Sequence, residues 1–354
     1  MKKIGIITLF GNINYGNRLQ NYAVHTILSR RGFQVETIVF ERNRWKPILY
    51  PAFNWTKRIL KKDPMAYRIY HFQLFNRTHI PFRTIFHKAY RLPRGFSEEY
   101  DYFVTGSDQV WNITASYEEG YKSILLLEFA NDVQKICISP SIGVPAFDEN
   151  DSIRMRKALS GYKYICCREK QGAQELARIT GRTCEWLIDP TLYLTAEDWK
   201  QLLNIHQDMS GSYLFIFFLD GISLELRSFI HDFAQRRGLQ ILDPSDPVSP
   251  FFSVDPGEFI KLLASSEIVF TDSFHVTVFS INFHIPFYVF DRNKMKNRSS
   301  RIESICECLD LSNRFIREQQ PFEIKETCNF EAAETELLLQ RNLFSAYLDK
   351  CFEV

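Results

Sequence analysis

No stretch of this sequence is apolar for long enough to cross a membrane, which takes about 18 consecutive apolar residues. One of the longest apolar runs is Tyr213–Leu219. The N-terminal run Ile4–Phe10 follows two lysines and superficially resembles a secretory signal. It is too short, however, and Gly11-Asn12 follows it in place of a small-residue cleavage site. We therefore predict a cytoplasmic protein whose first apolar run is a strand.

The signatures of bound metals and common cofactors are also missing. The eight cysteines include no C-x-x-C pair, and no Cys/His group has zinc spacing. Adjacent Cys166 and Cys167 are expected to pack on opposite faces of a strand rather than to act as nucleophiles. The motifs G-x-G-x-x-G, G-x-x-x-x-G-K-[ST], G-x-S-x-G, H-E-x-x-H and D-x-D do not occur. The sequence predicts reduced thiols, no metal and no redox cofactor.

Neither sign of charge predominates, because 43 Lys+Arg stand against 42 Asp+Glu and give a net charge of +1. A globally basic nucleic-acid binder is not expected, and no nucleic acid is predicted as a partner. The charge is uneven, however. Residues 42–95 hold 13 Lys+Arg, one acid (Asp63) and 11 aromatic residues. This basic aromatic segment is typical of peripheral contact with an anionic membrane surface or a lipid-linked ligand, and equally of a helical excursion with a solvated basic face.

The remainder of the chain alternates short apolar runs with helical patterns, which is typical of parallel sheets covered on both faces. The 354 residues exceed what one hydrophobic core usually holds. We therefore predict an α/β fold of two Rossmann-like domains whose parallel sheets face a central cleft. The domains are predicted at residues 1–200 and 201–354, with a boundary near 195–212 and a long C-terminal helix over Glu331–Lys350.

The expected elements are defined by these runs. Strands are predicted at Ile4–Phe10, Gln34–Phe40, Tyr102–Thr105, Lys135–Ser139, Tyr162–Cys166, Glu185–Ile188, Tyr213–Leu219, Leu239–Leu242, Ile268–Thr271 and Pro286–Phe290. Helices are predicted at Asn17–Arg31, Gln171–Ile179, Ser223–Arg237, Pro256–Ala264 and Phe274–Asn282. Polar loops follow seven of the strands, and ligands of such sheets bind beyond the carboxyl ends of strands.

Four motifs occur in order along the chain: GNRLQNYA from Gly16, GSDQVWN from Gly106, DPT from Asp189 and TDSFHVTVFS from Thr271. Ser300-Arg301-Ile302 follow them. In combination these motifs resemble the polysaccharide pyruvyl transferase family. The resemblance implies a fold similar to GT-B glycosyltransferases. It also implies transfer of pyruvate from phosphoenolpyruvate onto two hydroxyls of a sugar, as a cyclic ketal, with galactose as one candidate sugar.

The sequence departs from the family pattern at two places. Some members carry Arg two residues before the histidine of the last motif, where this chain has Ser273. Many carry Gly after that histidine, where this chain has Val276. The first departure puts one contact with the donor phosphoenolpyruvate in doubt. The second narrows the loop that carries His275.

The predicted site residues follow from this chemistry. His275, at the start of a helix, is a candidate acid or phosphate ligand, or a helix-capping residue without chemistry. Asp108 is a candidate base or a turn residue that bonds its own backbone. Arg168 is a candidate donor ligand or an interdomain ion pair. The further donor-binding candidates are Ser273, Arg292 and Arg301, and the acceptor-binding candidates are Asn12, Tyr15, Asn17 and Trp111.

Two other functions stay open at this point. One is a GT-B glycosyltransferase that uses a sugar nucleotide, since such enzymes often need no D-x-D metal site. The other is a catalytically silent protein that binds a glycan or a lipid intermediate. The predicted partners are phosphoenolpyruvate and a sugar or lipid-linked oligosaccharide acceptor, with the protein peripheral at the inner face of the membrane through residues 42–95.

Overall fold

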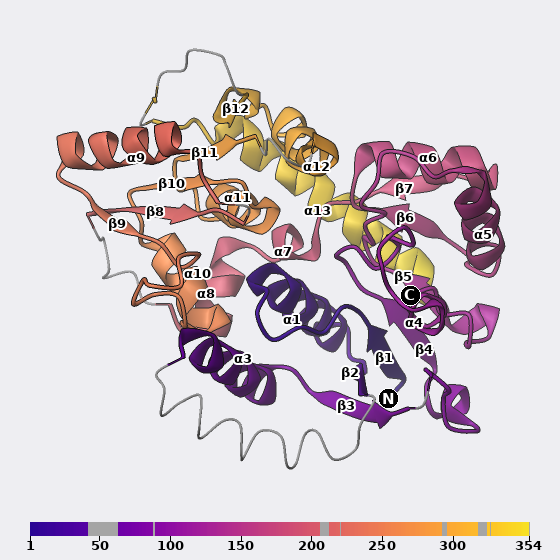
Figure 1. Ribbon diagram of the computed structural model, residues 1–354. Helices are drawn as coiled ribbons and strands as arrows, with labels where there is room; N and C mark the ends of the chain where they lie inside the picture. The colour runs from indigo at the N-terminus through magenta and orange to yellow at the C-terminus, as the bar shows by residue number, and fades with distance from the viewer. Residues whose placement is uncertain are drawn as a thin grey trace.

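The computed structural model describes residues 1–41, 63–87, 89–205, 212–219, 221–291, 296–317, 324–325 and 327–353. Within them, two parallel five-stranded sheets lie side by side and are covered by helices (Figure 1). Most core strands are buried along their length. Burial on both faces explains their apolar runs without alternation. The predicted α/β architecture of two Rossmann-like domains around a central cleft is confirmed.

The first sheet has the strand order β3–β2–β1–β4–β5, and all of its pairs are parallel. Its strands are β1 (Lys3–Ile7), β2 (Gln34–Glu41), β3 (Phe82–Phe86), β4 (Tyr102–Thr105) and β5 (Lys135–Cys137). The chain leaves β1 in one direction and returns to its other side at β4. The carboxyl ends of these two strands therefore border a crevice where a ligand can bind.

The second sheet has the order β12–β11–β10–β8–β9 and is also parallel throughout. Its strands are β8 (Tyr213–Phe217), β9 (Gln240–Leu242), β10 (Ile268–Thr271), β11 (Phe287–Phe290) and β12 (Phe315–Ile316). The direction of winding reverses between β8 and β10. This sheet thus has a second crevice, at the carboxyl ends of β8 and β10.

Two further strands, β6 (Ile165–Cys167) and β7 (Cys184–Trp186), form a separate two-stranded parallel sheet. Cys166 and Cys167 are fully buried in β6, so their prediction as packed strand residues is confirmed. All eight cysteines are free thiols.

The helices begin and end where the sequence provides caps. Asp255 accepts hydrogen bonds from the amides of Gly257 and Glu258 at the start of α10, and Gly238 ends α9 in the left-handed conformation. The helices are α1 (Tyr15–Arg30), α3 (Pro64–His79), α4 (Glu119–Leu125), α5 (Glu149–Leu159), α6 (Lys170–Thr180), α7 (Pro190–Tyr193), α8 (Ala196–Leu203), α9 (Leu224–Arg237), α10 (Pro256–Ala264), α11 (Phe274–Asn282), α12 (Lys296–Cys308) and α13 (Glu331–Phe352), with 3-10 turns at Phe96–Glu99, Asp132–Gln134 and Ser312–Arg314.

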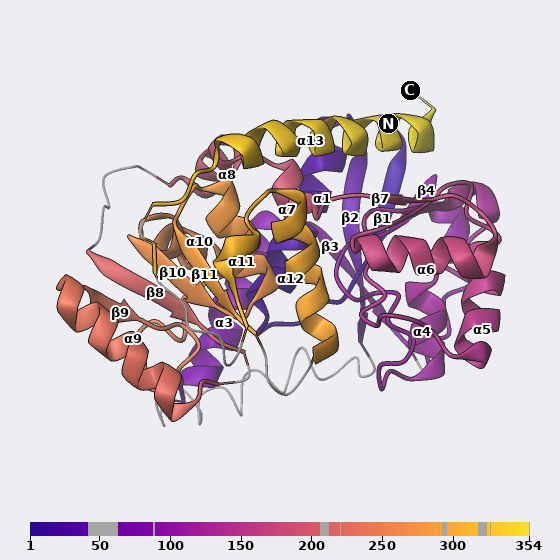
Figure 2. The same cartoon turned by 90° about the horizontal axis from the view of Figure 1, so that it is seen from above.

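The C-terminal helix α13 does not belong to the second domain alone. Figure 2 shows it running across the top of both domains. Near its end the Tyr347 hydroxyl lies 3.2 Å from the Cys137 sulfur, and the Phe352 ring packs against Phe33 with 4.6 Å between ring centres. The last turns of α13 therefore pack on the first domain, and the predicted division into residues 1–200 and 201–354 stays a prediction.

The described residues of the basic aromatic segment include the helix α3 and the strand β3. Residues 42–62 and 88 lie outside the described residues. The helix α3 agrees with the predicted helical excursion, but it leads into the edge strand β3, which the sequence analysis did not predict. No described helix is both long enough and apolar enough to span a membrane.

Candidate active site

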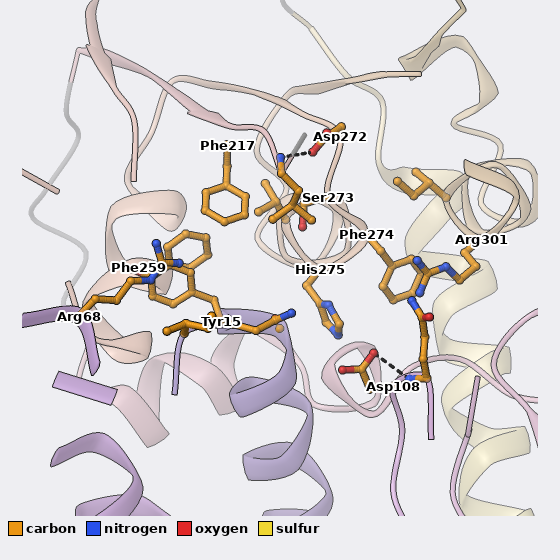
Figure 3. A pocket seen from close by; sticks show the side chains of 17 residues that line it. Tyr15, Arg68, Asp108, Phe217, Phe259, Asp272, Ser273, Phe274, His275 and Arg301 are labelled. Carbon is orange, nitrogen blue, oxygen red and sulfur yellow. Dashed lines mark hydrogen bonds between the residues drawn. The ribbon is translucent and has the colours of Figure 1, made fainter. Parts of the chain in front are cut away.

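A cleft of about 290 Å³ lies where the carboxyl ends of β1, β4, β8 and β10 meet. Both sheets thus contribute their crevice to a single site (Figure 3). Six elements or their loops supply its charged and polar lining, which consists of Asn14, Arg68, Asp108, Gln109, Asp272, Ser273, His275 and Arg301. The cleft thus lies beyond the strand ends and between the domains, which is where the site is predicted.

Asp189 lies beneath this cleft and joins three segments of the first domain. Its Oδ1 accepts hydrogen bonds from the Thr191 amide (2.9 Å) and hydroxyl (2.7 Å). Its Oδ2 accepts from the Ser107 hydroxyl at 2.8 Å and from the Arg168 guanidinium at 2.9 Å. Burial pushes the pKa of Asp189 upward, but the charges of His275 and Arg168 and the bonds from Thr191 bring it down to about 2. Asp189 is therefore a fixed anion under the cleft.

His275 lies directly above this anion, as the second residue of α11. Its Nε2 is 3.8 Å from Asp189 Oδ2 and has no hydrogen-bond partner among the described residues. Burial lowers the pKa of His275, and repulsion from Arg168 and Arg301 adds to this, although Asp189 and Asp108 oppose it. The imidazole is therefore neutral at neutral pH.

The Nδ1 edge of the His275 ring, away from Asp189, lies against Gly16 in the first turn of α1. A Cβ at Gly16 would lie only 2.0 Å from His275 Nδ1 and 2.4 Å from Cγ. No side chain fits there while the ring keeps this position. The motif glycine of the first domain is thus matched to the motif histidine of the second, across the domain interface.

Asp108 faces His275 from the end of β4 (Figure 3). Its backbone has a φ of 71°, a left-handed conformation that is strained for a residue with a side chain. Asn17 Nδ2 donates to its Oδ2 at 3.0 Å, and the Gln109 amide donates to its Oδ1 at 2.9 Å. Burial raises the pKa of Asp108, but Arg168, His275 and these two bonds more than compensate and lower it. Asp108 is therefore an ionised carboxylate in the cleft.

The start of α11 forms a positively polarised wall. Ser273 is the N-cap residue, yet its side chain makes no capping hydrogen bond. A helix start with uncapped amides favours an anion. Arg301 lines the same wall, and its guanidinium carbon lies 5.9 Å from the centre of the Phe274 ring. Ser273 and Arg301 thus both line the cleft, and their role in binding an anionic donor stays a prediction.

The opposite wall is aromatic. The Tyr15 ring stacks on the Phe259 ring at 3.9 Å between centres, and its hydroxyl donates to the Val254 carbonyl at 2.9 Å. The Arg68 guanidinium carbon lies 4.5 Å from the centre of the Tyr15 ring. Tyr15 therefore lines the cleft as predicted, but its hydroxyl already bonds the second domain.

Two predicted site residues do not line the cleft. Trp111 was predicted to stack on a sugar ring, but it is fully buried and packs edge-on against Tyr162. Arg168 was predicted to bind the donor, but its side chain is 1% exposed and bonds Asp189 behind the cleft wall, with its guanidinium 4.5 Å from the Phe274 ring centre. The sequence left open an interdomain ion pair for Arg168, but the observed ion pair joins it to Asp189 within the first domain.

The remaining predictions have different outcomes. Asn17 is buried and acts by holding Asp108. The Asn12 side chain accepts a hydrogen bond from Asn76 and does not line the cleft. Arg292 lies outside the described residues. Within the described ranges, no group of three or more His, Cys, Asp or Glu side chains is arranged to hold a metal ion.

Three residues at the cleft or directly beneath it, Asp189, Gly16 and Arg68, have no site role predicted from the sequence. Asp189 and Gly16 both lie in motifs that were recognised, so a signal for them existed. Arg68 lies in no motif, and only the packing of α3 places it in the cleft.

Comparisons with known proteins bear on both the family and the fold. The family model described as "Polysaccharide pyruvyl transferase" matches residues 14–294. A search of curated proteins finds no match. Among solved structures, the UDP-GlcNAc 2-epimerase of Methanocaldococcus jannaschii is 12% identical, with a TM-score of 0.50 and coverage of 96% of this chain and 93% of that one.

Two further solved structures have lower TM-scores. The UDP-N-acetylglucosamine 2-epimerase of Rickettsia bellii is 9% identical, with a TM-score of 0.44 and coverage of 100% and 98%. A heptosyltransferase of E. coli is 10% identical, with a TM-score of 0.38 and coverage of 96% and 99%. At 12% identity, the likeness to the Methanocaldococcus jannaschii structure bears on the fold and not on the ligand.

Proposed function

Because the chain belongs to the polysaccharide pyruvyl transferase family, we propose that it transfers the pyruvyl group of phosphoenolpyruvate to a sugar of a surface-polysaccharide precursor. The acceptor receives the group on two hydroxyls as a cyclic ketal, and galactose is one candidate acceptor. The observation that carries this proposal is the pairing of His275 with Asp108 between a positively polarised helix start and an aromatic wall.

The reaction needs one proton donor and one proton acceptor. One sugar hydroxyl adds to C2 of phosphoenolpyruvate while C3 gains a proton and becomes a methyl group. The second hydroxyl then displaces phosphate from C2. Two C–O bonds and one C–H bond form, one C–O bond to phosphate breaks, and no net oxidation occurs. The proton from the second hydroxyl leaves with the phosphate.

In this proposal His275 protonates C3. Its imidazole is neutral at neutral pH, because burial and two neighbouring arginines lower its pKa. A bound phosphoenolpyruvate adds negative charge nearby, which raises the pKa and favours the protonated acid. Asp108, held ionised by Asn17 and the Gln109 amide, accepts the proton of the attacking hydroxyl.

The donor's phosphate and carboxylate lie at the start of α11, near Ser273 and Arg301. Uncapped amides at a helix start and a guanidinium group suit these anions. Arg168 acts differently from the prediction made for it. It fixes Asp189 beneath His275 and so positions the histidine rather than contacting the donor.

Replacement of His275 tests the proposal. His275→Ala should fold and should lose transfer by roughly 10²-fold or more, because the general acid is removed. His275→Gln keeps a hydrogen-bond donor but cannot titrate, so activity in this variant would assign a binding role instead of an acid role. His231→Gln, at an exposed position on α9, is the matched control. Turnover near that of the wild type in His275→Ala would contradict the proposal.

The proposal extends to a lipid-linked acceptor and peripheral contact with the inner face of the membrane. Residues 42–62 carry seven Lys+Arg and no acid. In the described part of the segment, Tyr70 and Leu74 on α3 and Phe82 and Phe86 on β3 are 39–50% exposed. Basic residues together with exposed aromatic and aliphatic side chains support surface attachment to an anionic leaflet.

A further inference from the structure

Arg68 differs from the other buried arginines. Arg18, Arg168 and Arg314 each donate to carbonyl or side-chain oxygens. Arg68 is 7% exposed, and among the described residues its Nε has no hydrogen-bond partner and no carboxylate is paired with its guanidinium. Its guanidinium carbon instead lies over two rings, 4.5 Å from the centre of Tyr15 and 4.7 Å from that of Phe252.

An unpaired buried cation costs the folded state free energy unless something compensates it. Burial lowers the pKa of Arg68, but an arginine stays protonated at neutral pH. Cation–π contact offsets only part of this cost. Arg68 lines the cleft, so a ligand there can supply the missing negative charge.

The surroundings of Arg68 are built to hold it in place. The neighbouring His71 ring contacts the Ser253 carbonyl, and the Tyr15 hydroxyl bonds the Val254 carbonyl at 2.9 Å. These contacts fix α3 and α1 to the 252–254 loop of the second domain. The guanidinium is therefore preorganised, which reduces the entropy lost on binding an anion.

Figure 3 shows Arg68 and Arg301 on opposite sides of His275. In the proposed function the donor's anionic groups lie on the Arg301 side, at the start of α11. The acceptor must then approach from the other side, which is the aromatic wall with Arg68. Among the described residues that line this wall, Arg68 is the cation.

We propose that Arg68 binds a phosphoryl group carried by the acceptor, so that the substrate is a sugar linked to a phosphate or diphosphate and not a neutral glycan end. This inference rests on the proposed function, because it takes the Arg301 side as the donor site. Bidentate contact with phosphoryl oxygens is the chemistry that a fixed guanidinium favours. The phosphoryl group can belong to a lipid diphosphate or to a nucleoside diphosphate, which are the two sources to be distinguished.

Calorimetric titration with inorganic pyrophosphate tests the inference directly. Phosphoenolpyruvate is titrated first, and pyrophosphate is then added at saturating phosphoenolpyruvate, so that the donor side is filled. Arg68→Gln should weaken pyrophosphate binding by about tenfold or more and change phosphoenolpyruvate binding by less than about twofold. Arg68→Lys should restore part of the affinity. Arg77→Gln removes the same charge from an exposed position on α3 and is the matched control.

The outcomes separate the two claims. Unchanged pyrophosphate affinity in Arg68→Gln, or no pyrophosphate binding by the wild type, would overturn the inference. An equal loss for phosphoenolpyruvate would also overturn it, because Arg68 would then belong to the donor site. A wild type that binds pyrophosphate through Arg68 but does not bind phosphoenolpyruvate would contradict the proposed function alone.

Two further measurements complete the test. Removal of an uncompensated buried charge should leave the melting temperature of Arg68→Gln unchanged or raise it, whereas a purely structural role predicts a fall. Competition by UDP but not by a short-chain polyprenyl phosphate would assign the anion to a nucleotide. The reverse would assign it to a lipid carrier.

Discussion

Gly16→Ala should disable the site by displacing His275, although it replaces none of the residues proposed to react. The added Cβ would lie 2.0 Å from His275 Nδ1, and ordinary carbon–nitrogen contact begins near 3.4 Å. The imidazole, or the whole second domain, must retreat by about 1 Å or more. A misplacement of that size costs about 10²-fold in rate. We therefore expect kcat to fall by about 10²-fold, while phosphoenolpyruvate binding at Arg301 changes less.

The direction of the stability change in Gly16→Ala shows whether the added Cβ clashes with His275. Overpacking of this kind costs about 1–3 kcal/mol, whereas Gly→Ala in an unobstructed helix stabilises by up to about 1 kcal/mol. Gly16→Ala should therefore lower the melting temperature of the wild type. In a His275→Ala background, where the clashing ring is absent, it should be neutral or stabilising. The double-mutant cycle isolates the contact between the two residues.

Gly11→Ala is the control for Gly16→Ala. No heavy atom lies within 4 Å of a Cβ built at Gly11, so this substitution should leave activity and melting temperature close to those of the wild type. Full activity in Gly16→Ala would refute the reasoning. An equal loss of stability in both backgrounds would refute it as well, because the clash would then not involve His275.

Three other predictions follow from the same geometry. Arg168→Lys cannot reproduce the buried bond to Asp189 or the packing over Phe274. Differential scanning fluorimetry should therefore show a lower melting temperature. Kinetics should show a lower kcat rather than only a higher KM for phosphoenolpyruvate. The pKa of His275 in the folded state lies below its usual 6.5, so the unfolded state takes up a proton first as the pH falls. The contribution of His275 to stability is therefore fully present above about pH 6.5 and is lost below it. Between about pH 7 and 5 the melting temperature should fall less in His275→Gln than in the wild type. Charge reversal in the basic segment should weaken binding to anionic vesicles at low salt by up to about 1 kcal/mol per residue, as measured by co-sedimentation. It should also slow turnover of a lipid-linked acceptor but not of a soluble glycoside. Equal vesicle binding by the variant and the wild type would reject membrane attachment. The residues to reverse are Lys57, Arg58, Lys61 and Lys62.

The elements that carry the site were predictable from the sequence. The bounds of β10 and α11 agree with the prediction, because a short buried apolar run, a polar N-cap residue and a helical pattern follow one another directly. The edge strand β3 was missed for the opposite reason. Phe82–Phe86 is half exposed and lies inside a basic segment, so no continuous apolar run marks it.

The positions of His275 and Asp108 in the cleft were predictable because both follow strands of parallel sheets. The positions of Arg168 and Trp111 were not. Each also follows a strand, but the sequence does not show which side chains beyond a strand end face the ligand and which lie beneath. Arg168 bonds a carboxylate 21 residues away in the sequence, and Trp111 packs on Tyr162. Such tertiary partners decide burial.

Arg68 shows a further limit of sequence reasoning. It entered the sequence analysis only as one of 13 cations in a basic segment. Its place in the cleft depends on the packing of α3 against Phe252, more than 180 residues later in the chain. No local pattern distinguishes it from the exposed Arg77 on the same helix.

The central claim is best tested by product formation in deuterated buffer. The protein is incubated with phosphoenolpyruvate and a panel of free and phosphorylated galactosides, glucosides and mannosides. The masses of the products are then determined by mass spectrometry. The account predicts a pyruvate ketal with one deuterium in its methyl group and one phosphate released per ketal. Phosphate release should be lost in His275→Ala. Absence of any ketal and of phosphate release, together with sugar transfer from a sugar nucleotide, would contradict it.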